Sequence, residues 1–308
     1  MASKPKLIVI CGPTGVGKTD VAVECAARIQ GEIINADSMQ VYRQMNIGTA
    51  KPSAAQRRRV RHHMIDILEP DEPFDAGGYE KLAAGVILHL NRAGIHGFVV
   101  GGTGLYIKSL IHGLFGQRTS DAAVRKELKE IAEKQGTQYL YEQLCMVDAR
   151  AAKQIHPHDT YRIIRALEVY RLTGKGISEF HHQHRFSNRR YKVLKIGLHE
   201  ERSVLYEQIN RRVDRMIRAG LVEEVQGLLN KGYSEDLKSM KSIGYRHMVA
   251  YLKGRLSFQE AVRILKQDTR RYAKRQLTWF RADKDILWFR ANQLDDMARH
   301  IDHFLKHP

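Results

Sequence analysis

The sequence predicts an α/β fold in which helices cover both faces of a mostly parallel sheet, with an all-helical domain inserted into it. Two observations predict this fold. Short apolar runs recur along the chain, and the segments between them are long enough for crossover helices. Between about Gly116 and Arg190 these runs disappear, and the sequence becomes helical and charged. We therefore expect a core formed by residues 1–116 and 190–308 and an insertion formed by residues 117–189.

The first strand and helix are expected near the N-terminal end. Leu7–Cys11 is apolar and ends at glycine and proline, and Thr19–Ile29 has apolar residues at helical spacing. Further buried strands are expected at Glu32–Ala36, Met64–Leu68, Gly97–Val100, Val193–Leu198 and Ile286–Phe289. Helices of the insertion are expected at Ala122–Gln135, Gln138–Leu144 and Thr160–Leu172.

The composition is that of a folded globular protein with a basic surface. The 308 residues are 43% hydrophobic and 28% charged, which suffices for a sizeable core. Lys and Arg total 51 against 34 Asp and Glu, and the net charge of +17 favours a polyanionic partner such as nucleic acid over a merely soluble basic protein. The three cysteines form no C-x-x-C pair, so neither disulfides nor a zinc site is expected. With no signal-peptide core or membrane span, we expect a cytoplasmic protein.

A glycine-rich segment follows the first strand and opens the first helix. Residues 12–19 read Gly-Pro-Thr-Gly-Val-Gly-Lys-Thr and match the phosphate-loop pattern G-x-x-x-x-G-K-[ST] in its required context. Backbone N–H groups and the helix N-terminus would face an anion, Lys18 would supply a point charge and Thr19 could hold Mg²⁺. The core is therefore expected to resemble P-loop NTPases, and the motif alone would indicate ATP binding by a kinase or an NTPase.

Polar residues follow two further expected strands. Asp37 ends one of them, and Ser38, Gln40, Tyr42 and Arg43 come within six residues of it, a set suited to reading a base and removing its proton. The alternative for this segment is a polar loop with an N-capping residue. Thr103 stands in a Gly-Gly-Thr-Gly turn after the strand Phe98–Val100, at the sheet edge where open α/β sheets bind ligands. A helix-capping Thr is the alternative there.

The order of these motifs resembles the bacterial tRNA dimethylallyltransferases, also called tRNA isopentenyltransferases. The resemblance runs nearly end to end, and the segments that carry it are Gly12–Thr19, Asp37–Arg43, Gly48–Pro52, His62–Ile67, Gly101–Tyr106, Ile155–Asp159, Arg162–Glu168, Lys241–Arg246 and Lys274–Arg281. The family implies transfer of a dimethylallyl group from its diphosphate to N6 of the adenosine 3′ of the anticodon, position 37, in tRNAs that read UNN codons. The phosphate loop would then hold an isoprenoid diphosphate instead of ATP.

The resemblance also implies individual roles. Asp37 would be the general base, Thr103 would contact the oxygen that bridges the allyl carbon and the diphosphate, and Lys18 and Arg212 would neutralise the leaving group. Four neighbouring arginines, Arg202, Arg211, Arg215 and Arg218, compete with Arg212 for this role. Diphosphate binding is expected at Gly12, Pro13, Thr14, Gly15, Val16, Gly17, Lys18 and Thr19, with Mg²⁺ on Thr19.

The partner implied is the tRNA anticodon stem-loop, whose target adenine must be flipped out of the stack. The family's RNA-contacting positions correspond here to Asp37, Ser38, Met39, Gln40, Thr103, Arg125, Tyr161, Arg162, Ile163, Ile164, Arg165, Lys241, Ser242, Ile243, Gly244, Tyr245, Arg246, Lys274, Arg275, Gln276, Trp279 and Arg281. We expect no membrane and no obligate protein partner, and a monomer. His62 and His63 are expected to be structural, because adjacent residues of a strand point to opposite faces. The tract His181–His184 is expected to be a mobile basic loop.

Departures from the family pattern are small. His158 and Gly176 replace the usual asparagine and proline, and Ala122 follows Asp121 where proline is usual, which leaves RNA contacts of the insertion less secure. Three other functions stay open at this point. A small-metabolite kinase shares the phosphate loop, an adenylate isopentenyltransferase shares the chemistry, and a non-enzymatic RNA chaperone would use the loop only as an anion site.

Overall fold

The computed structural model describes residues 4–113, 121–184 and 190–307, and it divides the chain into two compact units. Unit 1 comprises residues 1–111 and 190–308, and unit 2 comprises residues 112–189. The boundaries expected from the sequence, 116/117 and 189/190, both involve residues outside those described. No helix of the described part is both long and apolar enough to span a lipid bilayer.

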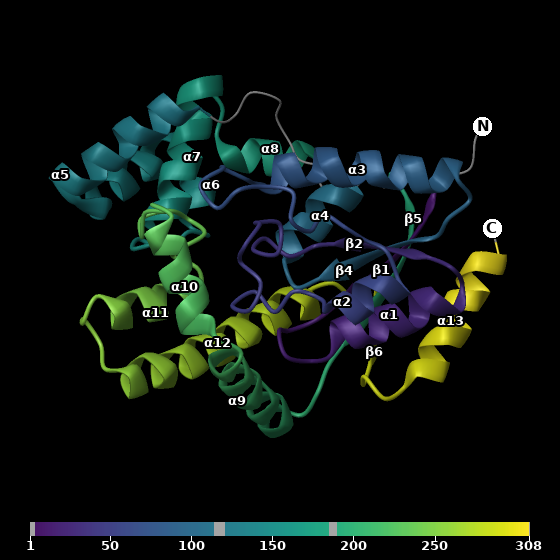
Figure 1. Cartoon of the computed structure of the whole chain (residues 1–308). Coiled ribbons are helices and arrows are strands. Elements are labelled where there is room, and N and C mark those ends of the chain that lie inside the picture. Colours follow the sequence, from purple (N-terminus) through teal and green to yellow (C-terminus); the bar gives the residue numbers. More distant parts are fainter. Residues whose placement is uncertain (1–3, 114–120, 185–189, 308) are drawn as a thin grey trace. The chain divides into compact units, whose positions relative to one another are not determined.

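Six strands of the described residues form one sheet in unit 1, with the order β3-β2-β4-β1-β5-β6 and every pairing parallel. The strands are β1 (Lys6–Cys11), β2 (Glu32–Asn35), β3 (His62–His63), β4 (Gly97–Gly101), β5 (Lys192–Leu198) and β6 (Ile286–Phe289). Helices α1 (Lys18–Arg28) and α13 (Leu294–Lys306) lie on one side of the sheet, and α3 (Ala76–Arg92) and α4 (Gly104–His112) lie on the other (Figure 1). The predicted α/β class with helices on both faces is confirmed.

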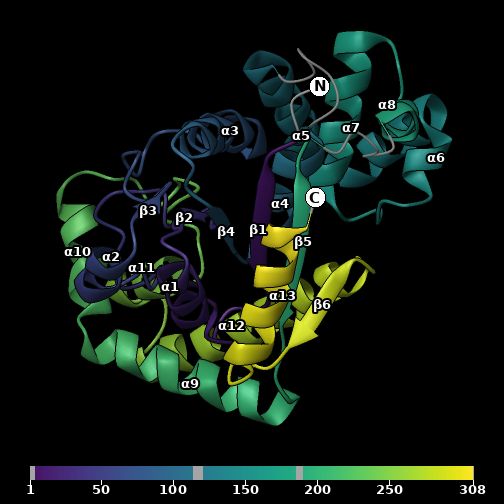
Figure 2. The ribbon, with the colours of Figure 1, turned by 90° about the vertical axis from the view of Figure 1, so that its right-hand side faces the viewer.

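The core explains why these apolar runs are strands. Alternate residues such as Ile8, Ile10, Phe98 and Val100 pack with α1, α13 and two further helices, α9 (Arg202–Arg218) and α12 (Phe258–Arg281). Because both faces are covered, the strands are apolar without alternation. Figure 2 shows β1 and β5 side by side, with α13 packed near them. The remaining helices of unit 1 are α2 (Ala54–Arg59), α10 (Leu221–Asn230) and α11 (Tyr245–Leu252).

One predicted strand is wrong. Met64–Leu68 is not extended, because Met64 and Asp66 have φ angles of 63° and 55°, which no strand residue adopts. Only the two residues before it, His62 and His63, pair with β2. The Asp66 carboxylate is held there by Lys51 at 2.5 Å and Arg57 at 2.8 Å, so ion pairs fix this loop. Leu68 makes a single bridge to Tyr42.

Unit 2 is helical and has its own core. Its helices are α5 (Ala122–Val147), α6 (Ala149–Ala152), α7 (Thr160–Thr173) and α8 (Ile177–His184). Helix α5 is broken at Gly136, whose φ of 85° is not helical, so the predicted division into two helices is confirmed. The expected loop at His181–His184 is wrong, since α8 covers this tract. Leu128, Leu140, Leu144 and Leu167 are buried together between α5 and α7.

Candidate active site

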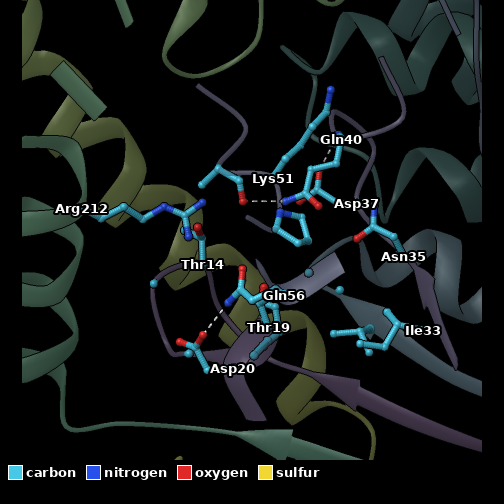
Figure 3. A pocket seen from close by; sticks show the side chains of 18 of the residues that line it. Thr14, Thr19, Asp20, Ile33, Asn35, Asp37, Gln40, Lys51, Gln56 and Arg212 are labelled. Atoms are coloured by element: carbon cyan, nitrogen blue, oxygen red, sulfur yellow. Dashed lines mark hydrogen bonds between the residues drawn. The ribbon is translucent and has the colours of Figure 1, made fainter. Parts of the chain in front are cut away.

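The parallel register brings three polar segments to one edge of the sheet. Cys11 lies opposite Gly101, and Asn35 lies opposite Val100, so the loops after β1, β2 and β4 leave the sheet side by side. These loops line a cavity of about 430 Å³ together with residues of α9 and α12. In Figure 3, Arg212 enters this cavity from one side, and Asp37 and Asn35 enter from the other.

The phosphate loop has the backbone that its glycines predict. Gly12, Gly15 and Gly17 have φ angles of 147°, 87° and 90°, in the region that favours glycine. A Cβ on Gly12 would also lie 2.6 Å from the carbonyl oxygen of Leu198, so the loop is packed against β5. Val16 is only 4% exposed, so only its backbone is available to an anion.

Two cations of this cavity influence each other. The Lys18 ammonium donates to the carbonyl oxygen of Pro13 at 2.7 Å. Burial and, next in size, the positive charge of Arg212 together lower the pKa of Lys18 to about 8, while Asp37 opposes the shift. Burial also lowers the pKa of Arg212, which Asp37 again opposes. Two cations that are desolvated in one cavity favour an anion between them.

Asp37 and Thr103 are held in fixed positions next to this cavity. Asp37 Oδ1 accepts hydrogen bonds from the backbone N–H of Met39 at 2.8 Å and of Gln40 at 3.3 Å. Thr103 Oγ1 accepts from the backbone N–H of Ser38 at 3.1 Å, and the Thr103 N–H donates to the carbonyl oxygen of Ala36 at 3.1 Å. Thr103 therefore ties the turn after β4 to the turn after β2, and Asp37 is fixed within its own turn.

A second, more apolar cavity of about 290 Å³ adjoins the first. It is lined by Met39, Val213, Met216, Ile243 and Leu265, among others. Four residues line both cavities: Thr14, Asp37, Arg212 and Tyr272. A ligand with an anionic end and an apolar end would fit across this junction.

Several of the expected RNA-contacting side chains are not available to RNA. Ile163, Ile164 and Tyr245 are 0%, 6% and 0% exposed and pack in the cores, and Gly244 is also buried. Gln276 is 6% exposed, and its amide is used inside the protein. Their burial leaves these five positions little side-chain surface for a phosphate or a base, and their contacts with RNA stay predictions.

Other expected contacts are exposed. Tyr161 is 75% exposed on α7 and Trp279 is 46% exposed on α12. The remaining exposed cations of the predicted set are Arg162, Lys241, Arg246, Lys274, Arg275 and Arg281. Three of them are paired within the protein, since Arg162 contacts Asp159 at 3.2 Å, Lys241 contacts Asp236 at 2.9 Å and Arg246 contacts Asp268 at 2.6 Å. Ser242 and Ile243 line the apolar cavity.

Arg125 and Arg165 of unit 2 share one buried carboxylate. Glu168 is 0% exposed and accepts from Arg125 at 3.0 Å, from Arg165 at 2.8 Å and from the backbone N–H of Asp121 at 2.9 Å. Burial would raise the pKa of Glu168, but these hydrogen bonds outweigh it and lower the pKa. The two arginines are 37% and 29% exposed, so they keep an outward face while Glu168 fixes their positions.

The sequence did not single out three residues near the site. Lys51 lies in a quoted motif without an assigned role, and its ammonium is 2% exposed and bonds Tyr42 O, Asn46 Oδ1 and Asp66 Oδ1. Arg43, which was expected to help Asp37 in reading a nucleobase, pairs with Glu69 at 3.0 Å. Tyr272 and Gln208 line the main cavity from α12 and α9. Helix periodicity places them on inward faces, but it does not say which cavity they meet.

The adjacent histidines diverge, as expected for a strand. His63 Nε2 lies 2.5 Å from Glu32 Oε2. His62 lines the main cavity, with Nδ1 on the carbonyl oxygen of Val60 at 2.7 Å, and its buried Nε2 has no partner among the described residues. The structural role expected of both histidines stays a prediction.

Comparison with known proteins identifies the architecture. A family model described as IPP transferase matches residues 40–283. The chain is 50% identical to a tRNA dimethylallyltransferase of Desulfosudis oleivorans, covering 93% of this chain and 91% of that one. It is 52% identical to tRNA dimethylallyltransferase 2 of Syntrophus aciditrophicus, covering 98% and 97%.

Solved structures agree. The tRNA isopentenylpyrophosphate transferase of Bacillus halodurans has a TM-score of 0.74 at 41% identity, covering 98% of this chain and 97% of that one. A eukaryotic dimethylallyltransferase acting on tRNA has a TM-score of 0.83 at 27% identity, covering 99% of this chain and 80% of that one.

Proposed function

The chain belongs to the IPP transferase family of tRNA dimethylallyltransferases, and we propose how its own residues carry out the transfer. It transfers a dimethylallyl group from dimethylallyl diphosphate to the adenosine at position 37 of tRNA. The single observation that carries our assignment of residues is the junction of the two cavities. Asp37 and Arg212 both line the anionic cavity and the apolar one.

We propose that the diphosphate lies in the main cavity against the backbone N–H groups of the phosphate loop. Lys18 and Arg212, both partly buried there, would neutralise its charge. The dimethylallyl group would extend from the junction into the apolar cavity, beside side chains such as Met216 and Leu265. Burial of this group in an apolar cavity would contribute to binding. ATP hydrolysis is not expected, since the loop serves to hold a leaving diphosphate.

The transfer step can then be written in balance. The N6 lone pair of the flipped adenine attacks the allylic carbon, and the carbon–oxygen bond breaks with its electrons going to the diphosphate. Asp37 takes the proton that N6 loses, because amide-like conjugation makes the neutral amine a weak nucleophile. The two backbone N–H groups on Asp37 Oδ1 orient the carboxylate for this role. Thr103 donates a hydrogen bond to the bridging oxygen as charge develops there.

The residues of the cavity also fit Mg²⁺. The Thr19 hydroxyl lines the main cavity and is an oxygen ligand of the kind this ion accepts. No cluster of three or more His, Cys, Asp or Glu side chains that could hold a metal occurs in the described part of the chain. The ion would therefore depend on Thr19, the diphosphate and water. When bound, it would neutralise negative charge on the departing diphosphate.

The RNA is proposed to be the anticodon stem-loop of tRNAs that read UNN codons, and the enzyme is proposed to act as a monomer. The exposed aromatics Tyr161 and Trp279 are suited to stacking on unpaired bases. The net charge of +17 would supply affinity for phosphates. An adenylate isopentenyltransferase, which would catalyse the same transfer to a free nucleotide, is the second candidate. The basic surface of this chain exceeds what binding of a free nucleotide requires.

The test is an incubation with labelled dimethylallyl diphosphate, Mg²⁺ and unmodified tRNA, beside parallel reactions with AMP and with ATP. Label should enter tRNA and not AMP, and ATP should not be hydrolysed. Label in AMP at a comparable rate would support the second candidate instead. A stem-loop with guanosine at position 37 should accept no label.

A further inference from the structure

Gln40 lies in the turn that carries Asp37, and its side chain lines the main cavity. The Gln40 backbone N–H donates to Asp37 Oδ1 at 3.3 Å, and both side chains border the same cavity (Figure 3). Gln40 is only 8% exposed, so its amide is held inside the protein and not on the outer surface. The turn therefore presents two polar side chains to one space, the carboxylate proposed as the base and an amide.

The direction of the Gln40 amide is fixed by two carbonyl groups. Its Nε2 lies 3.0 Å from the carbonyl oxygen of Thr49 and 3.2 Å from that of Ala50, so each of its two N–H groups has an acceptor. The opposite orientation would place the amide oxygen against both carbonyl oxygens, where no hydrogen bond can form. The amide nitrogen of Gln40 is thus fully used within the protein.

The loop that supplies these carbonyls is itself held by Glu224 of α10. The Glu224 carboxylate accepts from the three consecutive backbone N–H groups of residues 46–48, at 2.9, 2.8 and 3.1 Å, and from the Tyr245 hydroxyl at 2.5 Å. A Cβ on Gly48 would lie 2.4 Å from the Tyr245 ring, so the loop packs closely against this side chain. Gln40 therefore meets the carbonyl groups of a fixed loop, and its amide keeps one orientation.

The oxygen is the part of this amide that stays open to a ligand. None of the described residues donates a hydrogen bond to Gln40 Oε1, and solvent reaches this atom. An amide oxygen carries no proton, so it can only accept. A diphosphate presents acceptor oxygens as well, so it cannot be the direct partner of Gln40. The amino group of the target adenine is the donor that the other substrate brings to Asp37.

We propose that Gln40 is a specificity-determining residue, whose amide oxygen accepts the second hydrogen of the adenine amino group while Asp37 takes the first. This assignment rests on the function proposed above. Adenine N6 carries two hydrogens, and the transfer removes only one of them. The other stays on N6 in the product, and without Gln40 it would lack an acceptor inside the site, which is costly for a buried donor. Guanine carries an oxygen in place of this amino group, and that oxygen would face two acceptors.

The test compares adenosine with N6-methyladenosine at position 37 of an anticodon stem-loop, with dimethylallyl diphosphate and the full-length protein. N6-methyladenosine keeps one hydrogen for Asp37, but its methyl group replaces the hydrogen that Gln40 would accept. The wild-type kcat/KM should therefore be at least about 5-fold higher for adenosine. Gln40→Met keeps the length of the side chain and removes the oxygen. It should lower the kcat/KM for adenosine about 5- to 100-fold more than the kcat/KM for N6-methyladenosine.

The ratio of the two kcat/KM values separates contact with the amino group from support of the loop. Glu224→Gln is the matched control, because it weakens the hold on residues 46–48 and keeps the Gln40 oxygen, so it should lower both values by the same factor. Equal values for the two nucleosides in the wild-type enzyme, which needs no variant, would overturn the proposal. An unchanged ratio in Gln40→Met would also overturn it. No transfer to adenosine at position 37 would instead overturn the proposed function itself.

Discussion

Lys18 and Arg212 direct two positive charges at one cavity, and the repulsion between them is second only to burial in lowering the pKa of Lys18 to about 8. Such an arrangement costs free energy in the absence of an anion. Bound diphosphate would remove that cost, because its negative charge offsets the repulsion between the two cations. The relief of this repulsion would add to the binding free energy of the diphosphate. The first two predictions follow from this pair.

Removing the charge of Arg212 should weaken the binding and the stabilisation of the leaving diphosphate. Arg212→Gln should lower kcat/KM for dimethylallyl diphosphate by about 10- to 100-fold, the usual range for a lost hydrogen bond to a charged group. Steady-state kinetics with saturating tRNA measures this. Arg218→Gln, an exposed arginine on the same helix, is the control, and an equal loss in both variants would mean that only general surface charge matters.

The affinity for diphosphate should depend on pH through Lys18. Binding requires the charged ammonium, and the pKa of about 8 in the free protein means that this charge is present below pH 8 and lost above it. The Kd for inorganic diphosphate, measured by calorimetry and divided by the Kd of Lys18→Arg at the same pH, should thus be constant below pH 8 and rise by up to about tenfold per unit above it.

Lys18→Arg provides the control, because arginine stays protonated over this range. The ligand titrates identically with both proteins, so any difference in the slopes belongs to Lys18. The same rise in Kd in both proteins would show that Lys18 does not contact the ligand in its charged form.

The general-base role of Asp37 should be separable from tRNA affinity by mutation. Asp37→Asn keeps an oxygen that can accept from Met39 N–H and Gln40 N–H, but it cannot take a proton. Single-turnover transfer should slow by about two to four orders of magnitude, while the Kd for tRNA stays near the wild-type value. A variant that retains the wild-type rate would remove Asp37 from the chemistry.

The positions of the phosphate loop, Asp37 and Thr103 at one sheet edge could be predicted from the sequence, whereas the exposure of the expected RNA-contacting residues could not. Gly12–Thr19, Asp37 and Thr103 follow strand ends, and parallel strands must bring such ends to one edge, which the register of β1, β2 and β4 confirms. Their catalytic roles stay predictions. Resemblance between motifs covers whole segments and does not distinguish the two faces of a helix. In α7, Tyr161 points outward while Ile163 is buried two residues later.

Other features depend on contacts that no local pattern encodes. Met64–Leu68 is as apolar as a strand, but the ion pairs of Asp66 with Lys51 and Arg57 hold this segment in a turn with positive φ angles. Tyr272 lines both cavities because α12 crosses the turn after β4, where Gln276 bonds Gly102, a long-range arrangement set by tertiary packing. Sequence periodicity could place its side chain inward, but it could not name its partners.

Glu168 should stabilise unit 2 well beyond an ordinary surface pair. Glu168→Gln should reduce the free energy of local opening by about 1–3 kcal/mol at neutral pH, because the partial exposure of both arginines screens the full cost of a buried pair. Amide hydrogen exchange of α5 and α7 measures it. Since the pKa of Glu168 is lowered, this stability is present above its usual value of 4.5 and lost as the pH falls through the lowered pKa.

The control for that measurement is Glu127→Gln. Glu127 is 60% exposed and pairs with Arg171 at 2.8 Å on the surface of the same unit, so its loss should change exchange very little. Equal effects of the two substitutions would contradict a special role for the buried carboxylate.

Stacking on exposed aromatics should contribute to RNA binding. Tyr161→Ala should raise the Kd for an anticodon stem-loop by about 5- to 100-fold without changing the Kd for diphosphate, since one base–aromatic stack contributes about 1–3 kcal/mol. Fluorescence anisotropy with a labelled stem-loop is the measurement. Tyr139, 41% exposed on α5, is the matched control, and Tyr139→Ala should bind normally if the contact is specific to α7.

The most direct test of the central claim is a crystal structure with an unreactive thio analogue of dimethylallyl diphosphate and an anticodon stem-loop. We expect both phosphates against the backbone N–H groups of residues 12–19, the isoprenoid carbon at the junction of the two cavities, and adenine N6 within about 3 Å of an Asp37 oxygen. Phosphates bound elsewhere, or an adenine N6 out of reach of Asp37, would contradict it.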